Sequence, residues 1–167
     1  MMSLSFFKEI WRLEPFEIKN SSKVLTLIGP GVFLYSILIY RFNPGLVNIS
    51  FAREFFTLLF LGVGLLPLTK SKVVSEYYGF FVFLSMFAFE HYLIYMMALN
   101  NFSLDYLLGA YIATFGGILM LNNMWLIILF STFQLLHMTY RVTTNNVDLV
   151  TEGAILISIT TIFVFSF

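Results

Sequence analysis

The sequence lacks cysteine altogether and has very few charged residues. Its 167 residues include only 9 Lys and Arg and 9 Asp and Glu, and charged residues make up 11% of the chain. The absence of cysteine excludes disulfide bonds, thiolate metal sites and cysteine nucleophiles. Without a basic stripe, the chain also has no electrostatic footprint for nucleic acid. We therefore expect no nucleic-acid partner.

Recognisable catalytic motifs are missing as well. The chain has no serine elbow with an ordered Ser-His-Asp set, no glycine-rich phosphate loop and no two-histidine helix motif for zinc hydrolysis. We therefore predict no enzyme and no cofactor within these residues.

The chain is rich in apolar residues. Hydrophobic residues make up 59% of it, and the mean hydropathy is +0.89. Short polar breaks separate six apolar stretches, each near the roughly 20 residues that a helix needs to cross a bilayer. The pattern predicts an all-α membrane protein, a bundle of six transmembrane helices. The predicted spans are Val24–Tyr40, Phe55–Leu68, Tyr78–Leu99, Tyr106–Leu121, Met124–Tyr140 and Gly153–Phe167.

The positive charges are unevenly distributed between the two predicted sides. Lys and Arg are enriched in cytoplasmic segments of membrane proteins. With the N-terminus inside, six cations lie on the cytoplasmic side: Lys8, Arg12, Lys19, Lys23, Lys70 and Lys72. Three lie outside: Arg41, Arg53 and Arg141. The bias predicts that both termini are cytoplasmic.

Residues 1–22 form a predicted cytoplasmic amphipathic leader, and residues 23–167 form the membrane domain. The leader is either a short interfacial helix that Pro15 ends, or a loosely ordered segment that touches lipid through Trp11. Ser21 and Ser22 are the expected caps of the first membrane helix.

Four local features refine this outline. We expect a kink or break at Pro30, because proline removes a helical hydrogen bond. Asn43-Pro44-Gly45 predicts a turn, and Asn122-Asn123 is short enough to predict an antiparallel helical hairpin. Gly116-Gly117 would let a neighbouring backbone approach closely.

The last predicted span reaches Phe167 without a polar boundary. From Gly153 it rises only about 22 Å, which is less than a full crossing. We expect that this helix is cut before a cytoplasmic effector domain. The alternative is a natively short protein that ends in an apolar helix.

Two predicted spans carry ionisable or amide side chains. The third has Glu90 and His91 with Tyr95, and the fifth has Gln134 and His137. If both spans run outward, the depths of Glu90 and Gln134 agree within about 5 Å. Gln134 and His137 are three residues apart and share a helix face. The sequence therefore predicts a polar cluster with Glu90 buried against Gln134 or His137.

Three interpretations of this cluster remain open. It could fix helix packing, bind the polar head of a small amphipathic ligand, or carry proton or metal chemistry. A metal is disfavoured because Glu90 and His91 point about 100° apart on a helix. The ligand interpretation assigns polar contacts to Glu90, His91, Tyr95, Tyr111, Gln134 and His137, and apolar contacts to Phe87, Phe115 and Phe133.

The middle of the chain resembles a known class of membrane modules. The runs that carry the likeness are Glu90–Tyr95, Leu99–Ser103 and Tyr106–Gly109. They are similar to the N-terminal six-helix sensor module of bacterial sensor histidine kinases and nucleotide cyclases, including receptors of quorum-sensing autoinducers. The resemblance implies a multi-pass receptor of the bacterial inner membrane, acting as a homodimer in two-component signal transduction. It places no effector-domain residue within this chain.

Three function classes follow from these observations. The leading prediction is a receptor that binds a small amphipathic ligand, or senses the bilayer lipids, and relays through its sixth helix to a kinase or cyclase. The second is a substrate-binding subunit of a vitamin or other small-molecule importer. The third is a structural accessory subunit, which would leave Glu90 paired and His137 inaccessible.

Overall fold

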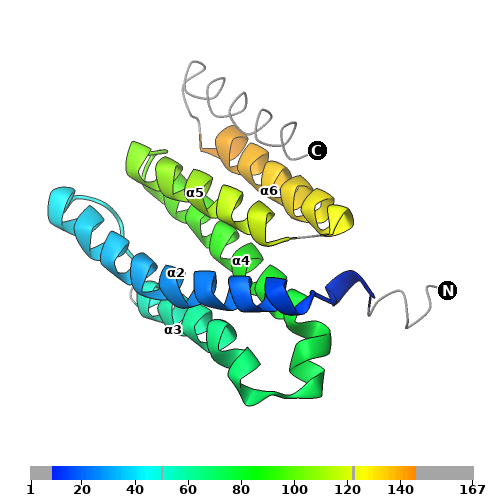
Figure 1. Cartoon of the computed structure of the whole chain (residues 1–167). Coiled ribbons are helices and arrows are strands. Elements are labelled where there is room, and N and C mark those ends of the chain that lie inside the picture. The colour runs from blue at the N-terminus through cyan, green and yellow to red at the C-terminus, as the bar shows by residue number, and fades with distance from the viewer. Residues whose placement is uncertain (1–8, 50, 122, 146–167) are drawn as a thin grey trace. The chain divides into compact units, whose positions relative to one another are not determined.

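The computed structural model describes residues 9–49, 51–121 and 123–145, and every regular element in these ranges is helical. The predicted all-helical class is therefore confirmed for this part of the chain. The elements, labelled in Figure 1, are α2 (Pro15–Phe42), α3 (Ala52–Leu65), the short 3-10 helix η1 (Leu66–Thr69), α4 (Lys72–Leu99), α5 (Leu104–Met120) and α6 (Met124–Thr144).

Three helical stretches are long and apolar enough to cross a membrane. They are Pro15–Phe42, Ala52–Thr69 and Lys72–Leu99, whereas Leu104–Met120 is apolar but shorter. The five described helices coincide with five of the predicted spans to within a few residues at most ends. The predicted sixth span, Gly153–Phe167, lies outside the described residues, so six spans with both termini inside stay a prediction.

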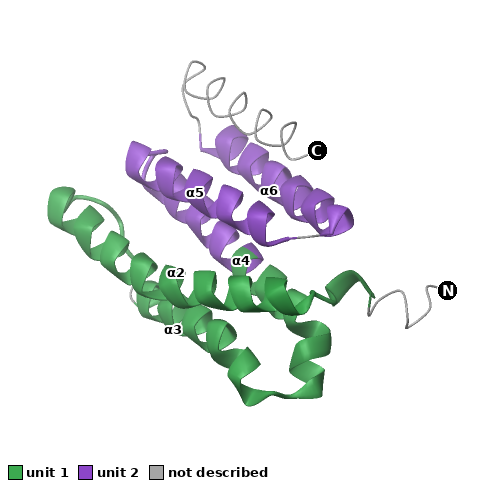
Figure 2. Ribbon diagram, in the orientation of Figure 1, with its two compact units in different colours: residues 1–86 green, residues 87–167 purple. Residues whose placement is uncertain are grey.

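The chain forms two compact units, residues 1–86 and residues 87–167 (Figure 2). The boundary falls within α4, after Met86. Unit 1 contains α2, α3, η1 and the first part of α4. Unit 2 contains the rest of α4 with α5 and α6. Each unit is considered by itself below.

The start of α2 corrects two predictions from the sequence. Pro15 does not end the leader helix; it is the first residue of α2, where its missing N–H matters least. The preceding helical residues end at Trp11. A capping box closes this end, because the Glu14 carboxylate accepts the backbone N–H of Glu17 and the Glu17 carboxylate accepts that of Glu14 at 2.7 Å. Ser21 lies inside α2 and caps nothing.

In unit 1, α2 and α3 lie side by side (Figure 1) and approach closely at Gly64. A Cβ on Gly64 would lie 2.6 Å from Thr26 Oγ1, and the Ser22 hydroxyl donates to the Gly64 carbonyl at 2.6 Å. Ser22 is therefore a contact between helices, not the predicted cap. Pro30 does not break α2, which continues to Phe42.

Trp11 joins the leader to the start of α4 within unit 1. Its indole ring makes edge contacts with Phe80 and Phe83, at centroid distances of 5.2 and 5.5 Å. A Cβ on Gly79 would lie 2.6 Å from the Trp11 carbonyl oxygen, so only glycine fits there. Trp11 is 7% exposed, which argues against the alternative in which a loosely ordered leader touches lipid through this ring. Close to this contact, Tyr77 interrupts the helical geometry of α4 with φ −120° and ψ 15°.

The predicted turns are confirmed where they are described. After α2, the Leu46 N–H donates to the Asn43 carbonyl at 3.2 Å. The link from α5 to α6 spans residues 121–123, and Asn123 caps α6 by accepting the Trp125 N–H at 2.9 Å. Gly116 does not provide the expected close approach, because a Cβ there would meet nothing within 4 Å.

Candidate functional site

Unit 2 contains a ladder of polar contacts between α4 and α6. The contacting pairs are Glu90 with Gln134, His91 with His137, and Tyr95 with Arg141. Their sequence offsets are 44, 46 and 46 residues. A near-constant offset means that the two helices run parallel, as expected when a single antiparallel helix joins them. Each step of the ladder is therefore fixed by the same helix register.

The first step is a buried group of three side chains from three helices. Glu90 from α4 is 1% exposed, and Thr114 from α5 and Gln134 from α6 are 2% and 8% exposed. The Gln134 amide donates to Glu90 Oε1 at 2.5 Å and also to the Thr114 hydroxyl. Thr114 Oγ1 lies 3.0 Å from Glu90 Oε1. The prediction that Glu90 is buried against Gln134 is confirmed.

The hydrogen bonds of this group are concentrated on one oxygen of Glu90. Oε1 lies within reach of both Thr114 and Gln134, while Oε2 is buried and has no hydrogen-bond partner among the described residues. Thr114 has one hydroxyl hydrogen, and the Ala110 carbonyl competes for it at 2.8 Å. Oε2 therefore retains unused hydrogen-bonding capacity, and in the neutral acid that burial favours its hydroxyl is a donor.

The second step is a histidine pair. His91 Nδ1 and His137 Nδ1 lie 2.7 Å apart, and Arg141 Nε donates to His137 Nε2 at 3.2 Å. Since His137 Nε2 accepts, the hydrogen of a neutral His137 must lie on Nδ1, from which it donates to His91. Phe87 stands beside His91 at a centroid distance of 4.2 Å.

The third step belongs to Arg141, near the end of α6. Its guanidinium lies 4.8 Å from the ring centroid of Tyr95 and 5.7 Å from that of Tyr140. A cation over an aromatic face is stabilised by the ring quadrupole. Arg141 therefore joins the ladder by its hydrogen bond to His137 and by its stacking on Tyr95.

The other predicted site residues differ in how deeply they are buried. The Tyr111 hydroxyl is buried, with no hydrogen-bond partner in the described ranges. Phe87 packs against Phe133 at 5.8 Å, but Phe133 is 47% exposed and Phe115 is 51% exposed. The two exposed rings present much of their surface away from the core. Sequence reasoning missed two members of the ladder, Thr114 and Arg141.

Metal binding finds no support in the ladder. Among the described residues, no group of three or more His, Asp and Glu side chains is placed to hold a metal ion. The proximity of the two histidines is explained by their mutual hydrogen bond.

Comparisons with known proteins add no name to this site. No protein-family model, curated protein or solved structure matches the chain. Its function must therefore be argued from the residues themselves.

Proposed function

We propose that the chain is the membrane-embedded receptor module of a bacterial signalling protein, and that it binds a small amphipathic ligand at the polar ladder. The observation that carries the proposal is the buried Glu90 carboxylate, which has one oxygen crowded with donors and the other without a partner in the described chain. Ionisable groups inside a membrane span are costly and tend to mark functional sites.

The unpartnered Oε2 of Glu90 defines the ligand chemistry. Burial favours the neutral acid, and its O–H at Oε2 meets no acceptor in the described chain, which costs about 1–3 kcal/mol. A ligand amine would recover this loss by taking the proton and pairing with the carboxylate, and a ligand hydroxyl would recover it by accepting the O–H. The Tyr111 hydroxyl, also buried, can add a second polar contact. An alkyl tail would be held by burial among apolar side chains, at about 0.8 kcal/mol per CH₂. The expected ligand has an amine or hydroxyl group in its head and an apolar tail.

The signal would arise from the way the ladder joins α4, α5 and α6. A ligand shifts a conformational equilibrium only if it binds one arrangement of the helices better than another. A head group bound at Oε2 leaves the bonds from Thr114 and Gln134 at Oε1 in place, so it favours the arrangement of α4, α5 and α6 in which these bonds hold Glu90. In this proposal the change passes through the predicted sixth span, Gly153–Phe167, to a cytoplasmic kinase or cyclase in a homodimer of the inner membrane.

The test compares amphiphiles that differ only in their heads. The purified chain in detergent micelles is heated with 1-decanol, decylamine or methyl decanoate at equal concentration, and its unfolding temperature is recorded. The alcohol and the amine carry donors, whereas the ester only accepts. We expect the greatest stabilisation by the amine, because it can take the proton of the buried acid and pair with Glu90, and a ligand bound to the native state raises its stability. Equal tail lengths cancel nonspecific partitioning.

Replacing Glu90 with Gln should reverse the order in which the amphiphiles stabilise the chain. The amide keeps an oxygen for Thr114 and Gln134 and presents an N–H₂ donor in place of Oε2. We expect the Glu90→Gln chain to prefer the ester. Identical responses of both chains to all three amphiphiles would contradict ligand binding at Glu90.

That outcome would favour a second candidate, a purely structural role. It has its own support, because Glu90 already bonds to Thr114 and Gln134 as a packing cluster requires. In a structural subunit, the head group of the amphiphile would make no difference, and Glu90→Gln would change only the stability of the helices.

A further inference from the structure

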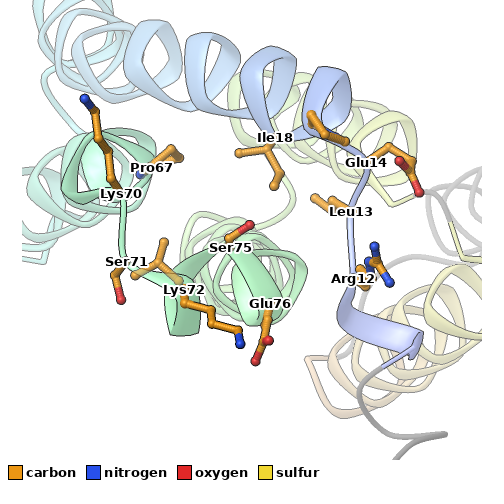
Figure 3. Close-up of a pocket in the computed structure, with 12 residues that line it drawn as sticks. Arg12, Leu13, Glu14, Ile18, Pro67, Lys70, Ser71, Lys72, Ser75 and Glu76 are labelled. Atoms are coloured by element: carbon orange, nitrogen blue, oxygen red, sulfur yellow. The ribbon is translucent and has the colours of Figure 1, made fainter.

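Unit 1 contains a pocket of about 680 Å³ that no part of the polar ladder lines (Figure 3). Its walls come from the stretch before α2, the first turn of α2, the end of η1 and the start of α4. Leu13 and Ile18 lie on one side and Ser75 on the other (Figure 3). Its volume falls within the roughly 300–1,000 Å³ typical of small-molecule sites.

The pocket lies at one end of the three helical stretches that can cross a membrane. α2 begins there at Pro15, the second stretch returns to it at Thr69, and α4 leaves from it at Lys72. Alternate crossings bring these three ends to the same side. If the helices span a bilayer, as the proposed function requires, the pocket opens at the headgroup level.

Its lining combines an apolar wall with an excess of positive charge. Three cations line it, Arg12, Lys70 and Lys72, against the two acids Glu14 and Glu76. The three cations are exposed, so they can turn toward a bound group. The Glu14 carboxylate is already engaged by the backbone N–H of Glu17 in the capping box.

Hydroxyl groups and apolar side chains complete the lining of the pocket. Ser71 and Ser75 offer donors beside the cations, and Leu13, Ile18 and Val74 offer carbon surface. Phosphate oxygens accept from both cations and hydroxyls, and the first methylene groups of the acyl chains suit the apolar wall. Basic pockets at the ends of membrane helices are suited to anionic lipid headgroups.

We propose that this pocket binds the phosphate group of an anionic phospholipid of the surrounding leaflet. The inference concerns unit 1 and requires only the membrane placement of the proposed function, not its ligand.

Retention of phosphatidylglycerol by the full chain tests the proposal. The chain is exchanged into mixed micelles of phosphatidylglycerol and phosphatidylcholine, and bound lipid is counted by native mass spectrometry. Lys70→Gln combined with Lys72→Gln should weaken phosphatidylglycerol retention about tenfold or more. Lys19→Gln combined with Lys23→Gln is the matched control, because these exposed lysines near the same end of α2 do not line the pocket.

A second variant distinguishes lipid binding in the pocket from general electrostatic attraction to the protein surface. Ser75→Trp keeps every charge but fills the cavity, and it should also lose the lipid. Retention by Ser75→Trp, or equal loss in the Lys19 and Lys23 control, would overturn the proposal in favour of a diffuse surface effect. Displacement of the lipid by millimolar glycerol phosphate, with no preference for the intact lipid, would overturn the lipid as the source of the phosphate.

The result is independent of the receptor proposal. Glu90→Gln should retain phosphatidylglycerol as the natural chain does, because Glu90 belongs to unit 2. Loss of lipid in that variant would instead report a disturbed fold, which circular dichroism of the same sample reveals.

Discussion

His91 and His137 face each other through the same ring atom, with their Nδ1 atoms 2.7 Å apart. Only one hydrogen can occupy that contact. Because Arg141 donates to the far nitrogen of His137, the shared hydrogen comes from His137 and His91 accepts it. One neutral tautomer of each ring satisfies all these contacts. The pair is therefore a directed hydrogen bond, whose strength can be measured by removing either side.

A double-mutant cycle should detect that bond. We expect His91→Phe and His137→Leu each to lower the free energy of unfolding, and the double variant to lose less than their sum by about 0.5–1.5 kcal/mol. Unfolding in a denaturing detergent, followed by circular dichroism, measures each term. His91→Phe combined with Thr143→Val is the control cycle and should be additive. Additivity of the histidine pair as well would mean that the contact contributes nothing.

Thr114 should stabilise unit 2 through its hydroxyl. Thr114→Val keeps the shape of the side chain and removes the contacts with Glu90 and Gln134, so we expect a loss of about 0.6–1.7 kcal/mol. Thr143→Val is the control, because that exposed hydroxyl bonds only to carbonyls of its own helix. Equal losses in the two variants would argue against a special role for the buried group.

The α2 and α3 contact of unit 1 depends on a missing side chain. Gly64→Ala would bring a methyl group 2.6 Å from Thr26 Oγ1 and 2.9 Å from the Thr26 nitrogen, and it should cost about 1–3 kcal/mol of unfolding free energy. Gly62→Ala meets nothing within 4 Å and should be neutral or stabilising by up to about 1 kcal/mol. Thermal unfolding of the two variants compares them directly. A tolerant Gly64 would show that the helices separate at little cost.

Trp11 should hold the leader against α4. Trp11→Ala removes its ring contacts with Phe80 and Phe83, and we expect faster trypsin cleavage after Arg12 because the local segment opens more often. Trp125→Ala is the control, since that ring is 67% exposed. Unchanged cleavage of Trp11→Ala would place the anchoring of the leader elsewhere.

The topology can be read from single cysteines, because the natural chain has none. We expect cysteines at Asn101 and Asn145 to react with a membrane-impermeant maleimide from the outside, and one at Asn123 to react only after the membrane is opened. Labelling of Asn123 from outside would reverse the orientation or remove a span.

Hydropathy located the described helices well but placed the start of α2 too late. The residues from Pro15 to Lys23 include Glu17, Lys19 and Asn20, so a search for apolar runs passes over them. They are helical because Pro15 suits a first helical position and Glu14 with Glu17 closes a capping box. Local capping chemistry, not apolarity, decided that boundary.

The contacts of the candidate site could be predicted only where the depth of a residue in its predicted span and its spacing along the helix were informative. Glu90 and Gln134 are unusual in apolar helices, and their similar depth predicted their contact. Thr114 is a common residue in such helices, and its role depends on the rotation of α5, which the sequence does not reveal. Arg141 was assigned to a loop, although α6 continues to Thr144 and brings it beside Tyr95.

Because α4 and α6 are parallel and in register, the three contacts of the ladder resist sliding of α6 along α4. If α6 slid by one turn, about 5.4 Å, Met138 would come opposite Glu90 and Arg141 opposite His91. The three contacts cannot form together at this new position or at any position between. All three pairs must therefore break before α6 can slide. A response that passes through this contact between α4 and α6 would be a step between two positions, all-or-none in each molecule.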